Sequence, residues 1–324
     1  MAPLAFGKSV FAKGAAGGAG AAEFGFVTGT HGDTQNSNVG FLATRVNVSG
    51  DSFGTPTVIS GSIWFRALLG DFGSERQFGY LIGGTPDNTG NRNVEVYLNR
   101  VGDGDGDVDD HSIVVGCQFT DGTRSISSFK TGADFFSGNS DFDNKVLDGN
   151  WHNLSFVFSA TNTDRQLRLD GVDINVSRTD GPGDSVTGTI DMDGNSYSGA
   201  NPPLQSPDNG QVFYHGTQQG PPGNFQAAFD IGPVWLYDSE IDFSNSSTMA
   251  QYYNSGNTDG YVTAGSQGTS AGAARAELFI TTDGSSVSNG GSLTNATFHE
   301  LGTVTKSDNS NGPGSGSTRT SANT

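Results

Sequence analysis

The sequence is poor in cysteine and in long apolar runs, and each shortage excludes a class of structure. Cys117 is the only cysteine among 324 residues, so the chain can form neither an internal disulfide nor a metal cluster built on several cysteines. It lies in the apolar run S-I-V-V-G-C-Q-F, where the simplest interpretation is a buried strand thiol. No stretch reaches the about 18 apolar residues that a membrane-spanning helix requires, so we expect no membrane insertion.

Positive charge is also scarce. Lys and Arg number 16 against 34 Asp and Glu, which gives a formal net charge of −18. Because such a surface repels phosphate, we expect no nucleic-acid partner. The N-terminal segment contains Lys8 and Lys13 but no unbroken apolar region, so it does not resemble a signal peptide. If the protein leaves a cell, we expect another route, such as lysis.

Helical periodicity is nearly absent, and the best candidate is a short helix at 244–255 with Ser and Asn near its start. Glycine, in contrast, is abundant. Its 49 residues are about twice the usual share of roughly 7%. Glycine costs backbone entropy inside helices and strands but frees turns. With 22 Phe to supply apolar volume, the composition predicts a β-sandwich with many strand connections.

Short β runs alternate with turn clusters along the middle of the chain. Residues 93–100 alternate with period two, so that Val94, Val96 and Leu98 face one side. We expect residues 112–119 to pair with them. Further strand candidates lie at 40–48, 57–69, 78–84, 151–159, 165–176 and 229–238. This spacing of strands and turns indicates a sandwich or barrel.

Composition divides the chain into three predicted parts. Residues 1–27 form a Gly/Ala-rich N-terminal arm, residues 28–256 carry the strand signals, and residues 257–324 form a Gly/Ser-rich extension. The extension contains a short β pair, with candidates at 276–282 and 296–305. Its low-complexity end cannot by itself bury enough apolar surface to offset the entropy of ordering.

Four segments between residues 60 and 254 resemble the laminin-G-like, concanavalin-like sandwich. L-D-G-N-W-H-N-L-S-F-V-F-S at 147–159, followed by R-Q-L-R-L-D-G-V at 165–172, resembles the family's W-H strand and the hairpin after it. Leu169 stands where that family usually has a tyrosine or a similar residue. S-G-S-I-W-F-R at 60–66 resembles an earlier strand. D-I-G-P-V-W-L-Y-D at 230–238, with M-A-Q-Y-Y-N after it, resembles the closing strand and short helix.

The resemblance implies an all-β fold, a concanavalin/laminin-G-like antiparallel β-sandwich or jelly roll, here with extended N- and C-terminal arms. It implies that His152 is structural rather than a ligand. Asp170-Gly171 is a hairpin-turn signal in its own right. The fold alone says little about function, because this sandwich hosts lectins, adhesion modules, hydrolases and virion parts.

The densest group of carboxylates lies in V-G-D-G-D-G-D-V-D-D-H at 101–111. The candidate metal ligands are Asp103, Asp105, Asp107, Asp109 and Asp110. Like charges this close repel unless solvated or neutralised, and Ca²⁺ takes about six to eight oxygen ligands. The spacing does not match an EF-hand, because Val108 and Val114 replace the required Gly and Glu. Both a bound Ca²⁺ and a solvated acidic hairpin tip stay open, and D-M-D-G-N at 191–195 is a weaker calcium candidate.

A second candidate site lies in the loop-rich segment 212–225. Its candidate contacts with a glycan or a protein partner are Tyr214, His215, Gln218 and Gln219. Aromatic rings and amides near turns suit the faces and hydroxyls of sugars. A loop of this length is equally suited to a contact within an assembly, so both interpretations stay open.

Signals of catalysis are weak. The β-glucanases that share this sandwich carry E-x-D-x-E on one strand, which places alternate carboxylates on one face. The nearest string here has Glu240 and Asp242 but Ser244 in the last position. The five histidines are scattered and show no H-E-x-x-H spacing. We therefore expect no enzymatic activity and assign no catalytic residue.

Our leading hypothesis is a structural protein on the exterior of a tailed-phage virion, as a head decoration protein or a tail-fibre or appendage component. A Met1 start without a signal peptide, an adhesion-type fold and the two arms motivate it. The expected partners are other capsid or tail proteins, a surface glycan, and the chain itself as a homo-oligomer, with a trimer expected. The alternatives are a free lectin-like carbohydrate-binding or adhesion module and, third, a polysaccharide hydrolase.

Overall fold

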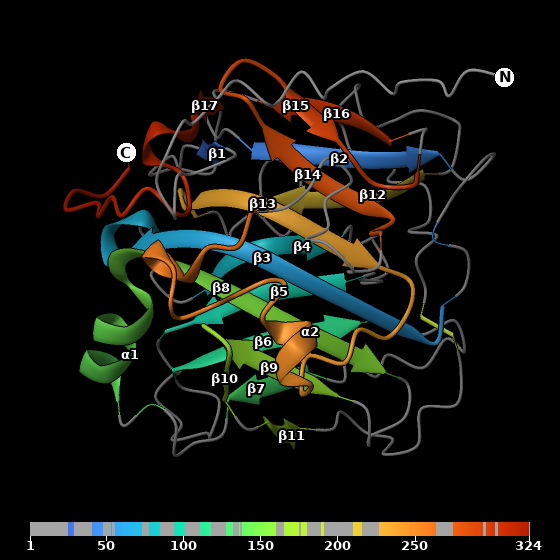
Figure 1. The fold of residues 1–324 in the computed structure, drawn as a ribbon, viewed down its shortest axis with the longest axis horizontal. Coiled ribbons are helices and arrows are strands. Elements are labelled where there is room, and N and C mark those ends of the chain that lie inside the picture. Colours follow the sequence, from blue (N-terminus) through green and yellow to red (C-terminus); the bar gives the residue numbers. More distant parts are fainter. Residues whose placement is uncertain are drawn as a thin grey trace, which may run out of the picture.

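Two antiparallel sheets pack face to face in the computed structural model (Figure 1). Every pair of neighbouring strands within them runs antiparallel. The predicted all-β sandwich is therefore confirmed. The structure describes residues 25–28, 41–47, 53, 56–72, 78–84, 94–100, 111–117, 128–131, 136, 138–159, 165–174, 176–179, 189–190, 210–215, 227–263, 275–293, 296–301 and 304–323.

Within these residues the first sheet has nine strands, in the order β10-β9-β8-β3-β13-β1-β17, with the β14–β15 hairpin joined to β13. Its strands are β1 (Phe26–Thr28), β3 (Val58–Leu68), β8 (Asp148–Ser159), β9 (Gln166–Leu169), β10 (Val172–Asp173), β13 (Asp230–Tyr237), β14 (Leu278–Thr282), β15 (Val287–Asn289) and β17 (Thr305–Ser307). The segments that resemble the laminin-G-like family form the adjacent strands β9, β8, β3 and β13 at its centre.

The second sheet has eight strands among the described residues, in the order β11-β7-β6-β5-β4-β12-β2-β16. Its strands are β2 (Phe41–Asn47), β4 (Phe78–Gly84), β5 (Val94–Asn99), β6 (Ser112–Cys117), β7 (Ser128–Thr131), β11 (Val176–Thr179), β12 (Gly210–His215) and β16 (Ala296–Leu301). Strands β5 and β6 pair as the sequence predicts, with Val94 opposite Cys117.

Among the residues that the structure describes, the helical segments are short. They are α1 (Asn139–Val146), α2 (Ser246–Met249) and the 3₁₀ turns η1 (Leu69–Phe72), η3 (Thr258–Gly260) and η4 (Asn309–Asn311). The predicted helix at 244–255 is α2, which is shorter than expected. Helix α1 was not predicted, because it spans eight residues and only Phe142 and Val146 are buried at helical spacing.

The main core fills the space between the two sheets. Val94, Val96 and Leu98 of β5 point into it, as their alternation predicts, and belong to the same buried cluster as Phe156 and Phe158 of β8. Side chains at every second position of a strand share one face, so each strand contributes an apolar row to this layer. Cys117 lies in the same core as a free thiol, and burial raises its pKa well above the usual value.

The nine-stranded sheet is buried on its outer face as well. A second apolar cluster there contains Trp64 of β3, Trp235 of β13 and Tyr252, Tyr261 and Phe279 from residues that follow β13. Trp235 stacks on Phe279 with ring centroids 5.0 Å apart, and Trp64 meets the edge of Tyr261 at 5.5 Å. The segment after β13 therefore covers this face.

Residues that follow position 256 add strands to both sheets. Strand β14 pairs with β13, β16 pairs with β2, and β17 pairs with β1. The strand candidates at 276–282 and 296–305 are β14 and β16, which join different sheets rather than each other. The sheets thus run across the proposed boundaries at 27/28 and 256/257, while the division into three parts stays a prediction.

The low-complexity end of the chain is held by buried charge and by packing, since Pro313 and Gly314 are buried and Gly314 lies against the ring of Tyr261. Arg319 forms ion pairs with Asp71 and Asp230, and Arg66 pairs with Asp230 at 2.8 Å. The Asp71 side chain is fully buried. The side-chain amide of Asn323 donates to Asp230 at 3.0 Å. These contacts within the chain order a segment that composition alone predicts to be poorly ordered.

Candidate functional site

The β9–β10 hairpin turns through Asp170 and Gly171, which both have positive φ angles, 52° and 74°. This is the geometry of a tight two-residue hairpin, and Val172 pairs with Leu169 across it. The predicted Asp-Gly turn is confirmed. Glycine is needed at position 171, because a Cβ atom there would lie 3.0 Å from Cδ1 of Tyr253.

The segment that carries Tyr253 begins at α2, just after β13. Asn245 caps this helix, and its side-chain oxygen accepts hydrogen bonds from the N–H groups of Ser247 (2.9 Å) and Thr248 (3.2 Å). The ring of Tyr253 stacks on Trp64 at a centroid distance of 6.2 Å. Because Trp64 is fully buried, Tyr253 is supported from inside the fold.

An open groove of about 430 Å³ lies between the β9–β10 hairpin and this segment. Figure 1 shows α2 on the outer side of the sheet, near β8 and β9. The groove lining combines charged, hydroxyl, amide, aromatic and aliphatic side chains. The lining residues are Arg168, Asp170, Gly171, Val172, Phe243, Ser244, Ser246, Met249, Ala250, Tyr253, Asn254 and Ser255. Val172 is 56% exposed and is the exposed large apolar residue of the described chain.

His152 fixes the hairpin turn from β8. Its Nδ1 lies 2.7 Å from Oδ2 of Asp170, and its Nε2 lies 3.0 Å from Oδ1 of Asp148. Burial alone would lower the pKa of His152, but these hydrogen bonds and the two negative charges raise it from 6.5 to about 9. The ring is therefore positively charged at neutral pH, and both of its nitrogens are engaged within the fold.

The charged groups of the groove are also engaged with neighbours. Arg168 donates from Nη1 to the carbonyl of Gly171 at 3.0 Å, and its Nη2 lies 3.6 Å from Oδ2 of Asp173. The N–H of Asn153 donates to Oδ1 of Asp170 at 2.8 Å. These contacts hold the polar groups in fixed positions at the groove wall.

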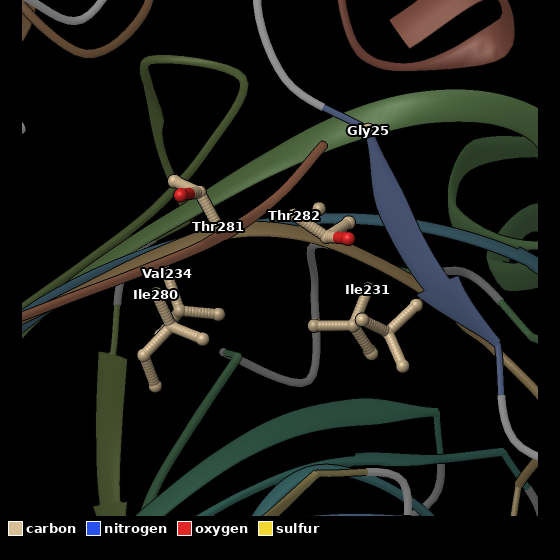
Figure 2. Close-up of a pocket in the computed structure, with 8 residues that line it drawn as sticks. Gly25, Ile231, Val234, Ile280, Thr281 and Thr282 are labelled. Atoms are coloured by element: carbon tan, nitrogen blue, oxygen red, sulfur yellow. The ribbon is translucent and has the colours of Figure 1, made fainter. Parts of the chain in front are cut away.

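A second, smaller pocket lies where β1 and β14 separate from β13, and Figure 2 shows its lining. Ile231, Val234 and Ile280 give it apolar walls. Its volume is about 10 Å³. That is room for about one water molecule, so the pocket is a packing gap rather than a ligand site.

The sequence-predicted site residues lie elsewhere. Asp103, Asp105, Asp107, Asp109 and Asp110 lie outside the described residues, as do Gln218, Gln219 and residues 191–195. Tyr214 and His215 belong to β12, where Tyr214 pairs with Ala43 of β2. They belong to the eight-stranded sheet, whereas the described groove residues come from β9, β10 and the segment after β13.

The string that resembles E-x-D-x-E follows β13 and does not form part of a strand. Asp242 accepts hydrogen bonds from the hydroxyl of Ser244 and from Nε2 of Gln166, which lower its pKa. It acts as a turn residue beside the groove. Across the described ranges, no group of three or more His, Cys, Asp or Glu could hold a metal ion, and no helix is long and apolar enough to cross a membrane.

No family model matches the sequence, and no curated protein matches it either. Solved structures with a similar fold include a candidate carbohydrate-binding protein of Bacteroides ovatus, at 10% identity over 88% of this chain and 61% of that one, with a TM-score of 0.47. The match thus spans less than two thirds of the Bacteroides ovatus protein.

Two further structures have related sandwiches. The heptameric SAP-like pentraxin of Limulus polyphemus is 11% identical over 88% of this chain and 95% of its own, with a TM-score of 0.46. Domains LG4-5 of the mouse laminin alpha1 chain are 13% identical over 95% of this chain and 78% of theirs, with a TM-score of 0.33. At these identities the likeness concerns the fold alone, a laminin-G-like, concanavalin-like sandwich.

Sequence reasoning missed the groove although it singled out both of its sides. The Asp170-Gly171 turn and the M-A-Q-Y-Y-N segment were each interpreted as structural motifs. Their separation along the chain hides that Gly171 lies against Tyr253. The available signal was the pair of adjacent tyrosines, of which Tyr252 is buried while Tyr253 remains partly exposed.

Proposed function

We propose that the protein is a lectin-like carbohydrate-binding module and that the groove beside the β9–β10 hairpin holds the glycan. The observation that carries this proposal is the ring of Tyr253, supported by Trp64, next to fixed hydroxyl, amide and charged groups. Sugars present C–H faces, which pack on aromatic rings, and hydroxyls, which exchange hydrogen bonds with such polar groups. The groove offers both kinds of surface on a rigid sheet.

The lining favours binding over hydrolysis. Among the described residues that line the groove, Asp170 is the one carboxylate, and its two oxygens already accept hydrogen bonds from His152 and Asn153. Glycoside hydrolases generally place a pair of carboxylates on either side of the scissile bond. A binding module needs no such pair.

The test compares two tryptophan substitutions on the same short helix. Ala250 lines the groove and Ser247 does not, and both residues are exposed. We expect Ala250→Trp to fill the groove and weaken glycan binding at least about tenfold, a loss of about 1.4 kcal/mol. Ser247→Trp serves as the control and is expected to bind as the wild type does. Binding is measured on a glycan array and then by titration calorimetry with the glycans that bind.

Two results would contradict the proposal. One is a wild-type protein that binds no glycan on an array of broad composition. The other is an Ala250→Trp variant that keeps wild-type affinity, because a glycan held elsewhere, for instance by Tyr214 or His215, would not sense the added ring. A folded state common to all variants is confirmed by their unfolding temperatures.

Display on the exterior of a phage particle stays a prediction, as does a homo-oligomer. The virion hypothesis is motivated by the composition of the two arms and by the type of fold. Mass spectrometry of purified particles would detect or exclude the chain. Calcium in the 101–111 loop also stays a prediction, and a rise in unfolding temperature on adding CaCl₂ would support it.

A further inference from the structure

Negative charge surrounds the groove. Asp170 lies in its wall, Asp173 contacts Arg168, and Asp242 binds Ser244 at the rim. Burial first, and then the negative charges of Asp170 and Asp259, raise the pKa of the Tyr253 phenol. The Tyr253 phenol thus lies within reach of the negative charges of Asp170 and Asp259.

Among the described residues, the two cations near the groove offset only part of this negative charge. The guanidinium of Arg168 is shared between the Gly171 carbonyl and Asp173, and the His152 ring is held between Asp170 and Asp148. Both positive charges are therefore already matched by carboxylates. The chain as a whole carries a net charge of −18, so the long-range field has the same sign as the local one.

The remaining groups of the lining suit uncharged hydroxyls. Ser246, Asn254 and Ser255 are exposed and can donate and accept hydrogen bonds. The raised pKa keeps the Tyr253 hydroxyl protonated, so it is a donor over the whole physiological range. Val172 and Met249 add apolar surface for C–H groups.

From this arrangement we infer that the groove selects glycans without acidic groups and discriminates against those that carry a carboxylate or a sulfate. The inference rests on the proposed function, because it concerns the ligand of the same groove. Its physical basis is that, among the described residues around the groove, the carboxylates of Asp148, Asp170, Asp173, Asp242 and Asp259 outnumber the cations of Arg168 and His152, so a further anion meets net negative charge.

The experiment uses the full chain and matched pairs of glycans that share a neutral core and differ only in a sialic acid, a uronate or a sulfate group. At low salt we expect the affinity for the acidic member to be at least about fivefold lower than for the neutral member. This difference in affinity is expected to shrink as salt screens the charges. Equal or tighter binding of the acidic members would overturn the inference while leaving the proposed function intact. Binding to no glycan at all would overturn the proposed function and the inference together.

A pair of charge variants identifies the groove as the source of the selectivity. Ala250→Lys places a cation in the lining, and Ser247→Lys places one on the same helix outside it. We expect Ala250→Lys to reduce the ratio of the affinities for neutral and acidic glycans by about two- to fivefold, which is the effect of one exposed ion pair. Ser247→Lys is expected to reduce it less. Equal effects of the two variants would show that the field of the whole molecule, and not the groove, sets the preference.

Discussion

His152 is a charged ring placed between two carboxylates, one at the start of β8 and one in the hairpin turn. Its contacts with Asp148 and Asp170 join the start of β8 to the hairpin turn that follows β9. The histidine of the W-H pattern therefore links β8 to the hairpin turn. Both of its ring nitrogens are engaged within the fold, so neither is left for a ligand. Because Asp170 lines the groove, its contact with His152 also helps to hold one wall of the groove in place.

The raised pKa of His152 makes stability depend on pH. A histidine whose pKa in the folded state exceeds its unfolded value stabilises the fold fully below pH 6.5, and this contribution disappears as pH rises through about 9. We expect the free energy of unfolding to fall between about pH 6.5 and 9, by at most about 3.5 kcal/mol at about 1.4 kcal/mol per pKa unit. Urea unfolding at each pH measures it.

His152→Gln is the informative comparison for this prediction. The variant keeps a hydrogen-bonding side chain but loses the titrating charge, so its stability is expected to change less over the same pH interval. Other groups titrate there as well, and only the difference between the two slopes belongs to His152. Parallel slopes for wild type and variant would contradict the assignment.

The sequence predicts single residues well where one pattern decides them. The alternation of β5 places Val94, Val96 and Leu98 in the core, as found. It does not predict that Glu95 on the opposite face is also buried. A period of two states which side chains share a face, whereas the cover over the second face comes from distant parts of the chain.

At the scale of elements, the β9–β10 hairpin and the α2 segment define the groove together. The hairpin was predictable because Asp-Gly favours positive φ angles, and α2 because Asn245 supplies its cap. Helix α1 was missed because its apolar signal is too short. Contact between hairpin and α2 segment was not predictable, since no local pattern reports that Tyr253 packs over Gly171.

Gly171→Ala tests how strongly the turn depends on glycine. Alanine would be strained at φ 74°, and its Cβ atom would press on Tyr253 at 3.0 Å. We expect a loss of about 1–2 kcal/mol in the free energy of unfolding, measured by urea denaturation. Gly256→Ala is the matched control, because its Cβ atom would meet only the flexible amide of Asn254. Equal losses in the two variants would refute this account of the turn.

At the scale of the whole molecule, distant segments are joined by buried charge. Burial raises the pKa of Asp71, while the hydrogen bond and the charge of Arg319 act in the opposite direction. Arg66 lies over the rings of Phe26 and Trp151 at 5.0 and 4.7 Å and pairs with Asp230. Composition indicates a loosely held end and misses this network, because the partners of Arg319 and Asn323, Asp71 and Asp230, lie far away in the sequence.

Arg319→Gln is expected to be strongly destabilising. Removal of its charge leaves Asp71 buried without its ion-pair partner, which typically costs about 3–5 kcal/mol. The control Lys306→Gln breaks an ion pair with the more exposed Glu300 and is expected to cost less than about 1 kcal/mol. Thermal and urea unfolding of both variants measure the difference. A loss below about 1 kcal/mol for Arg319→Gln would mean that the network does not hold the fold together.

The position of Arg319 has a consequence for protein synthesis. Asp71 leaves the ribosome long before Arg319, its ion-pair partner, and β1 receives its partner β17 only near the same late point. A polypeptide interrupted before residue 305 would lack both β17 and Arg319, which leaves β1 without that partner strand and the buried Asp71 without its ion-pair partner, and cellular proteases readily degrade such a partially folded product.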